Sequence, residues 1–439
     1  MGRVRPAELA IAPPPGRAGP VVVAAALACM VLFSEGAVQR LVAPEAAVDG
    51  NAVLRVMWLP VYAVIAALAL TQIRQIADVA RRLPVLMALV VLASVSFLWS
   101  IDPALSLRRG VGVAVTTVFG LYLVARFSFR EILMLLGALW LGLAAMSFVA
   151  GLAAPGFARD YEIHIGAWRG FWYEKNQLGG HMARASLIFA ALALIDAPRR
   201  WLWSVGLALT LALVALSTST TSLLATLIGG ALLAGGAALQ GRRAAALVGL
   251  WAGVTLAAAL AALIALQPDV FLALFGKDAT LTGRTDIWSA LAGSISQRPL
   301  LGFGYGAFWD PASQPAYWVR AAVDWEAPTA HNGWLEIALA TGLLGVFCYA
   351  ASFLGVLVQA LRRAHNHRLA LFAIAYLAQI AVFSFSESLL LEFNSLVWVT
   401  YVCVAGALAR GLGDEAAAVE GRARRRAGAP LRRNASGLI

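Results

Sequence analysis

Long, continuous apolar runs dominate the chain. Runs such as 83–99, 244–266 and 345–361 contain no charged residue, and roughly 20 apolar residues are enough to cross a bilayer as a helix. The apolar positions are continuous rather than alternating, which argues against an outer-membrane barrel. The pattern predicts an all-α, polytopic integral membrane protein with about 12 transmembrane helices. These are expected to start near Val21, Ala52, Leu83, Gly110, Ile132, Asn176, Trp201, Ser222, Ala244, Trp334, Leu369 and Ser395.

One long polar stretch interrupts this pattern, at 267–333. Connections elsewhere are short, and loops of this kind carry function while spans hold position. The predicted organisation is therefore an N-terminal tail over 1–20, nine transmembrane helices over 21–266, the large loop over 267–333, three transmembrane helices over 334–410, and an Arg-rich tail over 411–439.

Composition and charge support the membrane assignment and set its orientation. The chain is 61% hydrophobic and 13% charged, with a mean hydropathy of +0.78, too little charge to cover the surface of a soluble domain. With a cytoplasmic N-terminus, most of the 34 basic residues fall on the cytoplasmic side, as the positive-inside rule requires. Both termini are then cytoplasmic, and the large loop is periplasmic. The net charge of +11 reflects this topology and attraction to anionic lipid rather than nucleic-acid binding.

Ionisable residues within apolar runs are costly and often mark a polar cavity. Glu35, Arg55, Arg184, Glu387 and Glu392 form this set, and together they predict a cavity open to the outer face. Snorkelling or structural pairing is the alternative for each one. A hydroxyl run over 217–222 either lines the cavity or forms a tight turn between two spans.

A few cations fall on the predicted outer side, where the positive-inside rule disfavours them. Arg169 and Arg284 lie near the membrane surface, and Lys175 and Asn176 open the next span after Arg169. An anionic lipid head group such as a pyrophosphate would explain them, because guanidinium groups bind phosphate through planar, paired donors. Ordinary salt bridges, for example from Arg284 to Asp286, are the alternative.

His331 is the strongest catalytic candidate. It lies where the chain re-enters the membrane, just before Asn332 and a span that starts at Trp334. A neutral imidazole there could take a proton from an attacking hydroxyl. Alternatively, Asn332 caps the helix and His331 is a bystander. The histidines, cysteines and carboxylates show no zinc-binding spacing, so no metal or cofactor is expected.

The glycines at 302, 304 and 306 do not follow a strand in a βαβ unit, so a turn with aromatic flanks is favoured over a dinucleotide site. Aromatic residues of the loop are expected to stack on sugar rings or to form an interfacial belt.

Several of these motifs together resemble the superfamily of O-antigen ligases and O-antigen polymerases. Its signature is His followed by Asn, Ser or Gln, then nine residues, then Gly-x-x-Gly. This chain has His331-Asn332, the nine residues 333–341, and Gly342-Leu343-Leu344-Gly345. The segments 99–103, 169–179 and 283–302 also fit, and the pair 176–179 and 283–288 is most similar to the exopolysaccharide-polymerase branch.

This resemblance implies glycosyl transfer at the periplasmic face of the bacterial inner membrane, without a metal and with inversion. The implied donor is a glycan on undecaprenyl pyrophosphate. The implied acceptor is a second lipid-linked glycan (a polymerase, which we favour) or a lipid A core sugar (an O-antigen ligase), with membrane lipids and other polysaccharide-assembly proteins as further partners. Arg169 and Arg284 would bind the pyrophosphate with help from Lys175, Asn176 and Asn332, and His331 would activate the acceptor hydroxyl.

Two other classes compete with this one. A secondary transporter would also have about twelve spans, but it would carry paired midplane charges and inverted repeats, and no repeat is evident in the sequence. A non-catalytic scaffold for polysaccharide assembly would share the fold but would not need His331, Arg169 and Arg284.

Overall fold

The computed structural model describes residues 18–35, 37–42, 52–162, 164–242, 284–323 and 326–412, with side chains from residue 56 onward in the third of these ranges. Within these ranges the chain is helical, and extended pairing is limited to two isolated bridges, Ser34 with Ser395 and Arg159 with Trp168. The helices are α1 (Pro20–Leu32), α2 (Gln39–Val42), α3 (Ala52–Leu70), α4 (Ile73–Arg81), α5 (Pro84–Val95), η1 (Ser96–Leu98), α6 (Pro103–Arg126), α7 (Phe129–Ala153), α8 (Pro155–Ala158), α9 (Lys175–Ile195), η2 (Ala197–Arg199), α10 (Arg200–Leu216), α11 (Thr220–Leu239), α14 (Arg284–Gln297), α15 (Gln314–Val323), α16 (Gly333–Ala364), α17 (Arg368–Ser384) and α18 (Leu396–Ala409).

The all-α expectation is confirmed for the described residues. Six helices are long and apolar enough to cross a membrane, or seven if α3 and α4, which are bent by 88°, form one span. Four further apolar helices are shorter, with 10–17 residues. A helix occupies eleven of the twelve expected span positions, and the expected span near Ala244 lies outside the described residues. The count of twelve spans therefore stays a prediction.

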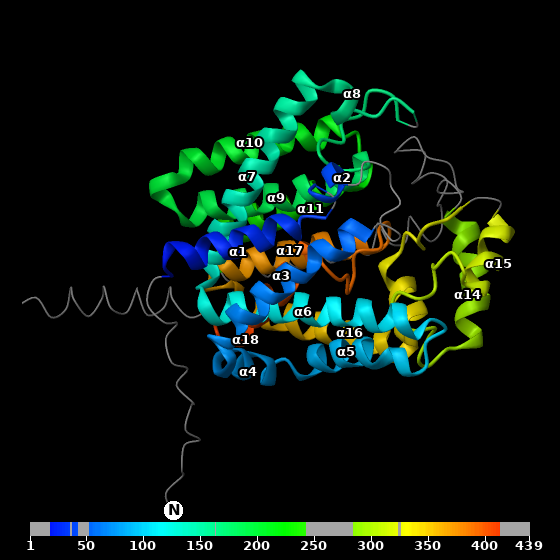
Figure 1. The fold of residues 1–439 in the computed structure, drawn as a ribbon. Helices are drawn as coiled ribbons and strands as arrows, with labels where there is room; N and C mark the ends of the chain where they lie inside the picture. Colours follow the sequence, from blue (N-terminus) through cyan, green and yellow to red (C-terminus); the bar gives the residue numbers. More distant parts are fainter. Residues whose placement is uncertain are drawn as a thin grey trace, which may run out of the picture.

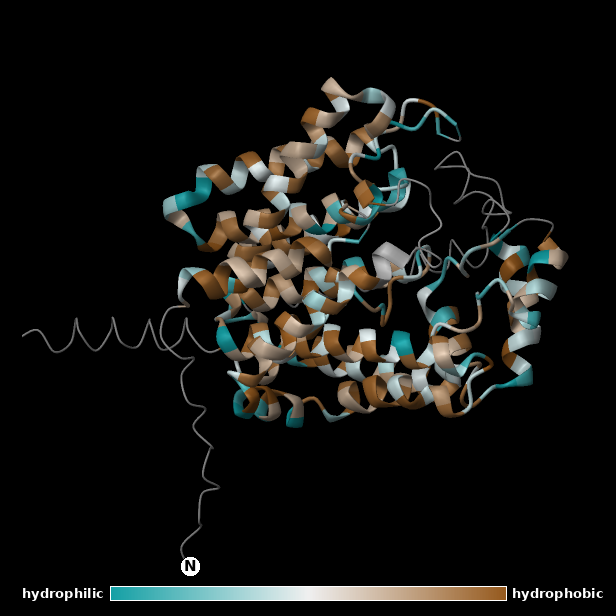
Figure 2. Cartoon of the chain, in the orientation of Figure 1, coloured by the Kyte–Doolittle hydropathy of each residue, from teal (hydrophilic) through white to brown (hydrophobic). Residues whose placement is uncertain are grey.

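The long helices run roughly side by side in one bundle (Figure 1). Helix α9 packs on α7, α10, α11 and α17, while α6 packs on α3, α5 and α18. Hydrophobic residues colour these helices almost throughout (Figure 2), and many large apolar side chains remain exposed on the outside of the bundle, as a lipid-facing surface requires. Several apolar helices of this length define a multi-pass membrane protein.

Helix α6 begins seven residues before the expected start of its span at Gly110. The side chain of Asp102 accepts a hydrogen bond from the Leu105 amide and so caps the helix, and Pro103 occupies its first turn. Arg108 and Arg109, which precede the expected start of the span, therefore lie in the second turn of α6.

The described part of the large loop folds into a small helical unit. Helices α14 and α15 pack against each other and lie beyond the end of the bundle, where α14 also contacts α16 (Figure 1). Their shared apolar core includes Ile287, Leu291, Phe308 and Val319, and it takes in Leu339 from α16. The first turns of α16 therefore belong to the loop's core as well as to the bundle.

The hydroxyl run at 217–222 forms the tight turn between α10 and α11, which was one of its two readings. Ser217, Ser219 and Ser222 are buried, and Ser222 donates a hydrogen bond to Ser219. A side chain at Gly179 of α9 would collide with the hydroxyls of Ser217 and Ser222, so the turn packs directly on that helix.

The Gly-x-x-Gly motif marks a break inside α16. Gly342 has φ 68° and ψ −168°, a conformation essentially restricted to glycine. The break frees backbone groups that pair with the segment 299–304: Leu343 N donates to Pro299 O at 2.8 Å, and Phe303 N donates to Leu339 O at 2.7 Å. A Cβ at Gly342 would lie 2.2 Å from the backbone of Leu300. Gly302, Gly304 and Gly306 also have positive φ, which confirms the turn reading of that run.

Replacing Gly342 with alanine is therefore expected to destabilise the protein by about 2 kcal/mol or more, because a left-handed conformation and a backbone collision are combined. The check is the thermal unfolding midpoint of the purified protein. Gly355→Ala in the same helix is the matched control, since a Cβ at Gly355 meets nothing within 4 Å. Equal midpoints for the two variants would contradict the assignment of Gly342 to the break.

Candidate functional site

The start of α16 carries the candidate base. Asn332 is the N-cap, and its side-chain oxygen accepts hydrogen bonds from the amides of Trp334 at 3.0 Å and Leu335 at 3.3 Å. The capping reading of Asn332 is thus confirmed. Because that oxygen is already occupied, any contribution of Asn332 to substrate binding would fall to its amide nitrogen.

His331 precedes this cap in a constrained backbone conformation. Its φ is 47°, a left-handed value that is uncommon outside glycine, and its amide donates to Thr329 Oγ1 at 3.3 Å. Burial lowers the pKa of the imidazole to about 4, and the nearby positive charge of Arg284 acts in the same direction. The ring is therefore neutral at pH 7 and able to accept a proton.

Arg284 is brought to His331 by the loop's own fold. It is the first residue of α14, and its Nη2 lies 4.0 Å from Glu387 Oε1 in the segment that joins α17 and α18. The sequence interpretation weighed Asp286 as the partner of Arg284, and the structure gives Glu387 instead. This pairing joins the large loop to the bundle beside the catalytic candidate.

Arg169 lies in the segment between α8 and α9, and Lys175 and Asn176 are the first two residues of α9. Arg169 Nε donates to Phe157 O at 3.3 Å, and Lys175 Nζ donates to Thr218 Oγ1, in the turn between α10 and α11, at 3.4 Å. Asn176 is partly buried in the first turn of α9. The structure thus brings Arg284 to His331, whereas Arg169, Lys175 and Asn176 lie elsewhere, at and before the N-terminal end of α9.

Arg40 organises the segment that holds Arg169. Arg40 is 6% exposed, and its guanidinium donates to the carbonyl oxygens of Gly170, Trp172 and Phe157. Burial, together with the positive charge of Arg169, lowers the pKa of Arg40 to about 10. The donors of Arg40 are therefore used to hold this turn.

A cavity of about 690 Å³ lies between these two groups of residues. Neither His331 nor any of the five predicted substrate-binding residues lines it, but their neighbours in sequence do. Pro328 and Thr329 line it next to His331, and Tyr173 and Gln177 line it next to Lys175. The remaining lining comes from Glu35, Gln39, Val56, Trp58, Leu59, Tyr62, Arg108, Arg109, Gly304, Tyr305, Gly306, Phe308, Trp309, Glu336, Ile337, Leu339, Ala340, Ser388, Leu390, Leu391, Glu392, Phe393 and Asn394.

Two of the five charges expected at membrane depth, Glu35 and Glu392, line this cavity, and its opening to the outer face stays a prediction. Glu35 accepts a hydrogen bond from Ser395 Oγ, and its Oε2 lies 3.7 Å from His181 Nε2. Burial raises the pKa of Glu35, while the positive charge of Arg184 opposes the shift. The side chain of Arg55 is outside the described residues.

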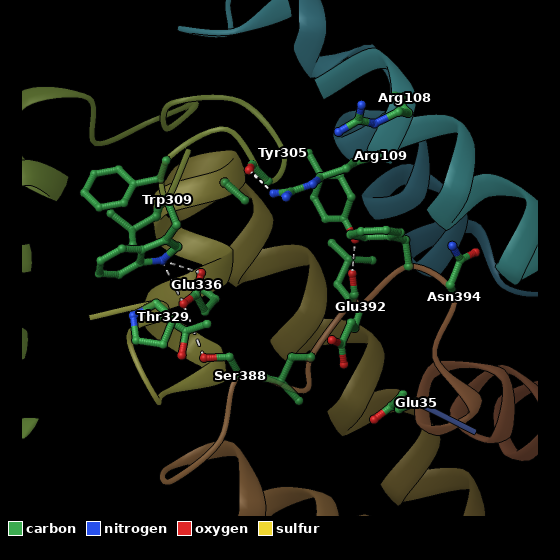
Figure 3. Close-up of a pocket in the computed structure, with 18 of the residues that line it drawn as sticks. Glu35, Arg108, Arg109, Tyr305, Trp309, Thr329, Glu336, Ser388, Glu392 and Asn394 are labelled. Carbon is green, nitrogen blue, oxygen red and sulfur yellow. Dashed lines mark hydrogen bonds between the residues drawn. The ribbon is translucent and has the colours of Figure 1, made fainter. Parts of the chain in front are cut away.

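Glu336 is a cavity residue that the sequence interpretation missed. It lies in the first turn of α16 and accepts hydrogen bonds from Trp309 Nε1 at 3.0 Å, from the Ala330 amide at 2.6 Å, and from Ser388 Oγ at 3.3 Å (Figure 3). These contacts fix the backbone directly before His331. A lone carboxylate four residues after a helix cap and inside an apolar run was the available signal.

Arg109 also fixes the cavity wall. Its Nη1 donates to the carbonyl oxygen of Gly306, and its guanidinium lies 5.6 Å from the centre of the Phe393 ring (Figure 3). Tyr305 donates its hydroxyl proton to Leu391 O. The glycine turn at 302–306 is thereby held between α6 and the segment before α18.

No group of three or more histidine, cysteine, aspartate or glutamate side chains suited to a metal ion occurs in the parts of the chain that the structure describes. The chemistry available at this site is that of a neutral imidazole, guanidinium groups and a polar cavity lined with aromatic residues.

These features define a multi-pass membrane protein with a candidate catalytic histidine beside a sugar-sized cavity. Residues 205–350 match the family model described as O-antigen ligase. The chain is also 30% identical over 270 residues to the "Exopolysaccharide production protein ExoQ" of Rhizobium meliloti (strain 1021), in a match that covers 59% of this chain and 61% of that protein. Part of the chain is thus similar to O-antigen ligases and to an exopolysaccharide production protein.

Proposed function

We propose that the protein transfers a glycan from undecaprenyl pyrophosphate to an acceptor hydroxyl, and that it acts as an exopolysaccharide or O-antigen polymerase. The observation that carries this proposal is the neutral imidazole of His331, held beside Arg284 and next to the cavity. The match to an exopolysaccharide production protein favours a polymerase. The description of the matching family model keeps an O-antigen ligase, with lipid A core as acceptor, as the second candidate.

In the proposed reaction, His331 accepts the proton of the acceptor hydroxyl as its oxygen attacks the anomeric carbon of the donor. The bond from that carbon to the pyrophosphate oxygen breaks, and negative charge grows on the leaving group. Arg284 stabilises this charge as a fixed donor, and Arg169 with Lys175 extends the cationic surface for the phosphates. Attack opposite the leaving group inverts the anomeric configuration, and no metal takes part.

The orientation of the protein in the inner membrane is part of the same proposal: the large loop lies in the periplasm, and the N- and C-termini lie in the cytoplasm. Arginine placement supports it. The start of α1 and the end of α18 lie at one end of the bundle, opposite α14 and α15 (Figure 1), as an even number of spans requires. The proposed partners are the lipid-linked donor, the glycan acceptor, membrane lipids and other polysaccharide-assembly proteins.

The deciding experiment is a reconstitution. Purified protein in liposomes is incubated with an undecaprenyl-pyrophosphate oligosaccharide, with and without lipid A core, and EDTA is present throughout. A ladder from donor alone is the expected result and identifies a polymerase. Product that forms only with lipid A core identifies a ligase. Absence of product in both tubes, with folded protein and native substrates, would contradict the proposal.

The pH dependence of transfer gives a further test of the base. A base must be neutral, so the rate should be constant around neutral pH and fall as the pH is lowered through about 4, the pKa of His331. Arg284 lowers that pKa, so Arg284→Gln should move the acid limb of the remaining activity to higher pH. The measurement is the initial rate of transfer against pH. An acid limb that stays in place in this variant would contradict the coupling.

A further inference from the structure

Glu392 is a charged side chain of the cavity lining without a direct partner. It makes no hydrogen bond and no ion pair with any residue that the structure describes, and the positive charge of Arg184 acts on it only from a longer distance. The other carboxyl groups of the lining are occupied: Glu336 accepts hydrogen bonds from three donors, and Glu35 is bonded to Ser395. The carboxyl group of Glu392 is therefore left to bond water or a ligand in the cavity.

The position of Glu392 is well defined by its neighbours. Tyr305 donates to the carbonyl of Leu391 on one side of it. On the other side, Asn394 receives a hydrogen bond from the Tyr62 hydroxyl at 2.8 Å, and its amide donates to Thr116 Oγ1 at 2.9 Å. The backbone on both sides of Glu392 is thus bonded to other elements, and its carboxyl group is held toward the interior of the cavity (Figure 3).

The rest of the lining suits a sugar ring. Trp58, Trp309 and Phe393 present aromatic surface to the cavity, and aromatic rings stack on the apolar faces of sugars. The volume of about 690 Å³ falls in the range of small-molecule sites. A carboxylate can accept hydrogen bonds from two adjacent hydroxyl groups at once, which is the arrangement a sugar ring offers.

Charge indicates which sugars fit. Three carboxyl groups line the cavity, from Glu35, Glu336 and Glu392, against the two guanidinium groups of Arg108 and Arg109. Burial raises the pKa of Glu35 and of Glu392, so this cavity disfavours negative charge, and a sugar that carries its own carboxylate would bind there less tightly. A neutral, hydroxyl-rich sugar would not.

We propose that this cavity is the acceptor-sugar subsite, that Glu392 binds a neutral sugar through paired hydroxyl groups, and that Glu392 is a specificity-determining residue of the transfer reaction. The proposal rests on the proposed function for the identity of the sugar as acceptor. The binding of a neutral sugar in the cavity does not depend on it, so the two can be tested separately.

The test uses the full chain in lipid nanodiscs and two small probes, methyl glucoside and methyl glucuronide, which differ by one carboxylate. Binding is followed by saturation-transfer NMR. Methyl glucoside is expected to bind the wild type more tightly than methyl glucuronide does. Glu392→Ala should weaken glucoside binding about tenfold or more, because the hydrogen bonds from two sugar hydroxyl groups are lost, and the affinity of Glu392→Gln should fall between those of the wild type and Glu392→Ala.

Glu162→Ala is the matched control, since Glu162 is exposed and lies outside the cavity. Thermal unfolding midpoints of all variants establish that they are folded. Equal glucoside affinity in the wild type and Glu392→Ala would overturn the proposal. So would glucuronide binding as tight as glucoside binding, or no saturation transfer from the wild type to the glucoside.

A third variant separates this proposal from the proposed function. His331→Ala should retain glucoside binding while it loses glycan transfer. If it keeps transfer activity, the proposed catalytic role fails and the sugar site stands. If it loses both, the cavity is not an independent sugar site and this proposal fails.

Discussion

Replacing His331 with alanine is expected to lower the rate of glycan transfer by about 10² to 10⁴-fold, the usual contribution of a positioned general base. The imidazole is neutral because burial and Arg284 lower its pKa to about 4, so it can accept the acceptor's proton at neutral pH. Alanine removes that function without disturbing the cap at Asn332, whose contacts are with Trp334 and Leu335. The measurement is the rate of polymer formation in liposomes.

His164→Ala is the matched control for this variant, because His164 is exposed in the segment between α8 and α9. It should transfer glycan at the wild-type rate. Membrane insertion and the unfolding midpoint of His331→Ala should match those of the wild type. Retention of most of the activity by folded His331→Ala would remove this histidine from the mechanism.

The second large effect is expected from Arg284→Ala, which should reduce transfer by about 10² to 10³-fold, as removal of a fixed donor to a developing anion does in other enzymes. Arg284→Lys should recover only part of this loss, because an ammonium group cannot offer two parallel donors to a phosphate. The readout is the single-turnover rate of transfer with saturating donor.

Loss of the contact between Arg284 and Glu387 is the competing explanation for such a defect. Glu387→Gln tests it, since this variant also breaks the ion pair but leaves the guanidinium in place. Its rate should stay far closer to the wild type than the rate of Arg284→Ala. Equal losses in the two variants would mean that the ion pair, rather than the phosphate interaction, accounts for the effect.

Much of the fold could be predicted because continuous apolar runs are a local signal. Ten of the expected starts lie close to a helix start or its cap, and the exception inside a described helix, Gly110, failed because Asp102 and Pro103 begin α6 earlier. The spacing from His331 to Gly345 was also informative, because it contains the first part of α16, from its cap at Asn332 to its break at Gly342.

The site was only partly predictable, because its geometry depends on contacts between distant parts of the sequence. No local pattern predicts that Arg284 pairs with Glu387 or that Glu35 pairs with Ser395. Glu336 was missed for the same reason, because its role in holding the backbone before His331 depends on hydrogen bonds from Trp309 and the Ala330 amide. The charges predicted at membrane depth indicated a cavity, but the residues that line it could be identified only from the three-dimensional structure.

The break in α16 also separates two parts of that helix that pack in different surroundings. Before Gly342 in the chain, Leu339 packs into the core of the loop, and Glu336 and Ile337 line the cavity. After Gly342, Tyr349 and Val356 pack into the core of the bundle. The segment that carries His331 is therefore held from two sides, by the core of the loop through Leu339 and by the bundle through Ile337 and the hydrogen bond from Trp334 Nε1 to Ser384 Oγ. The base consequently stands on the seam between the loop and the bundle, so that a substitution in either core can change its position relative to the cavity.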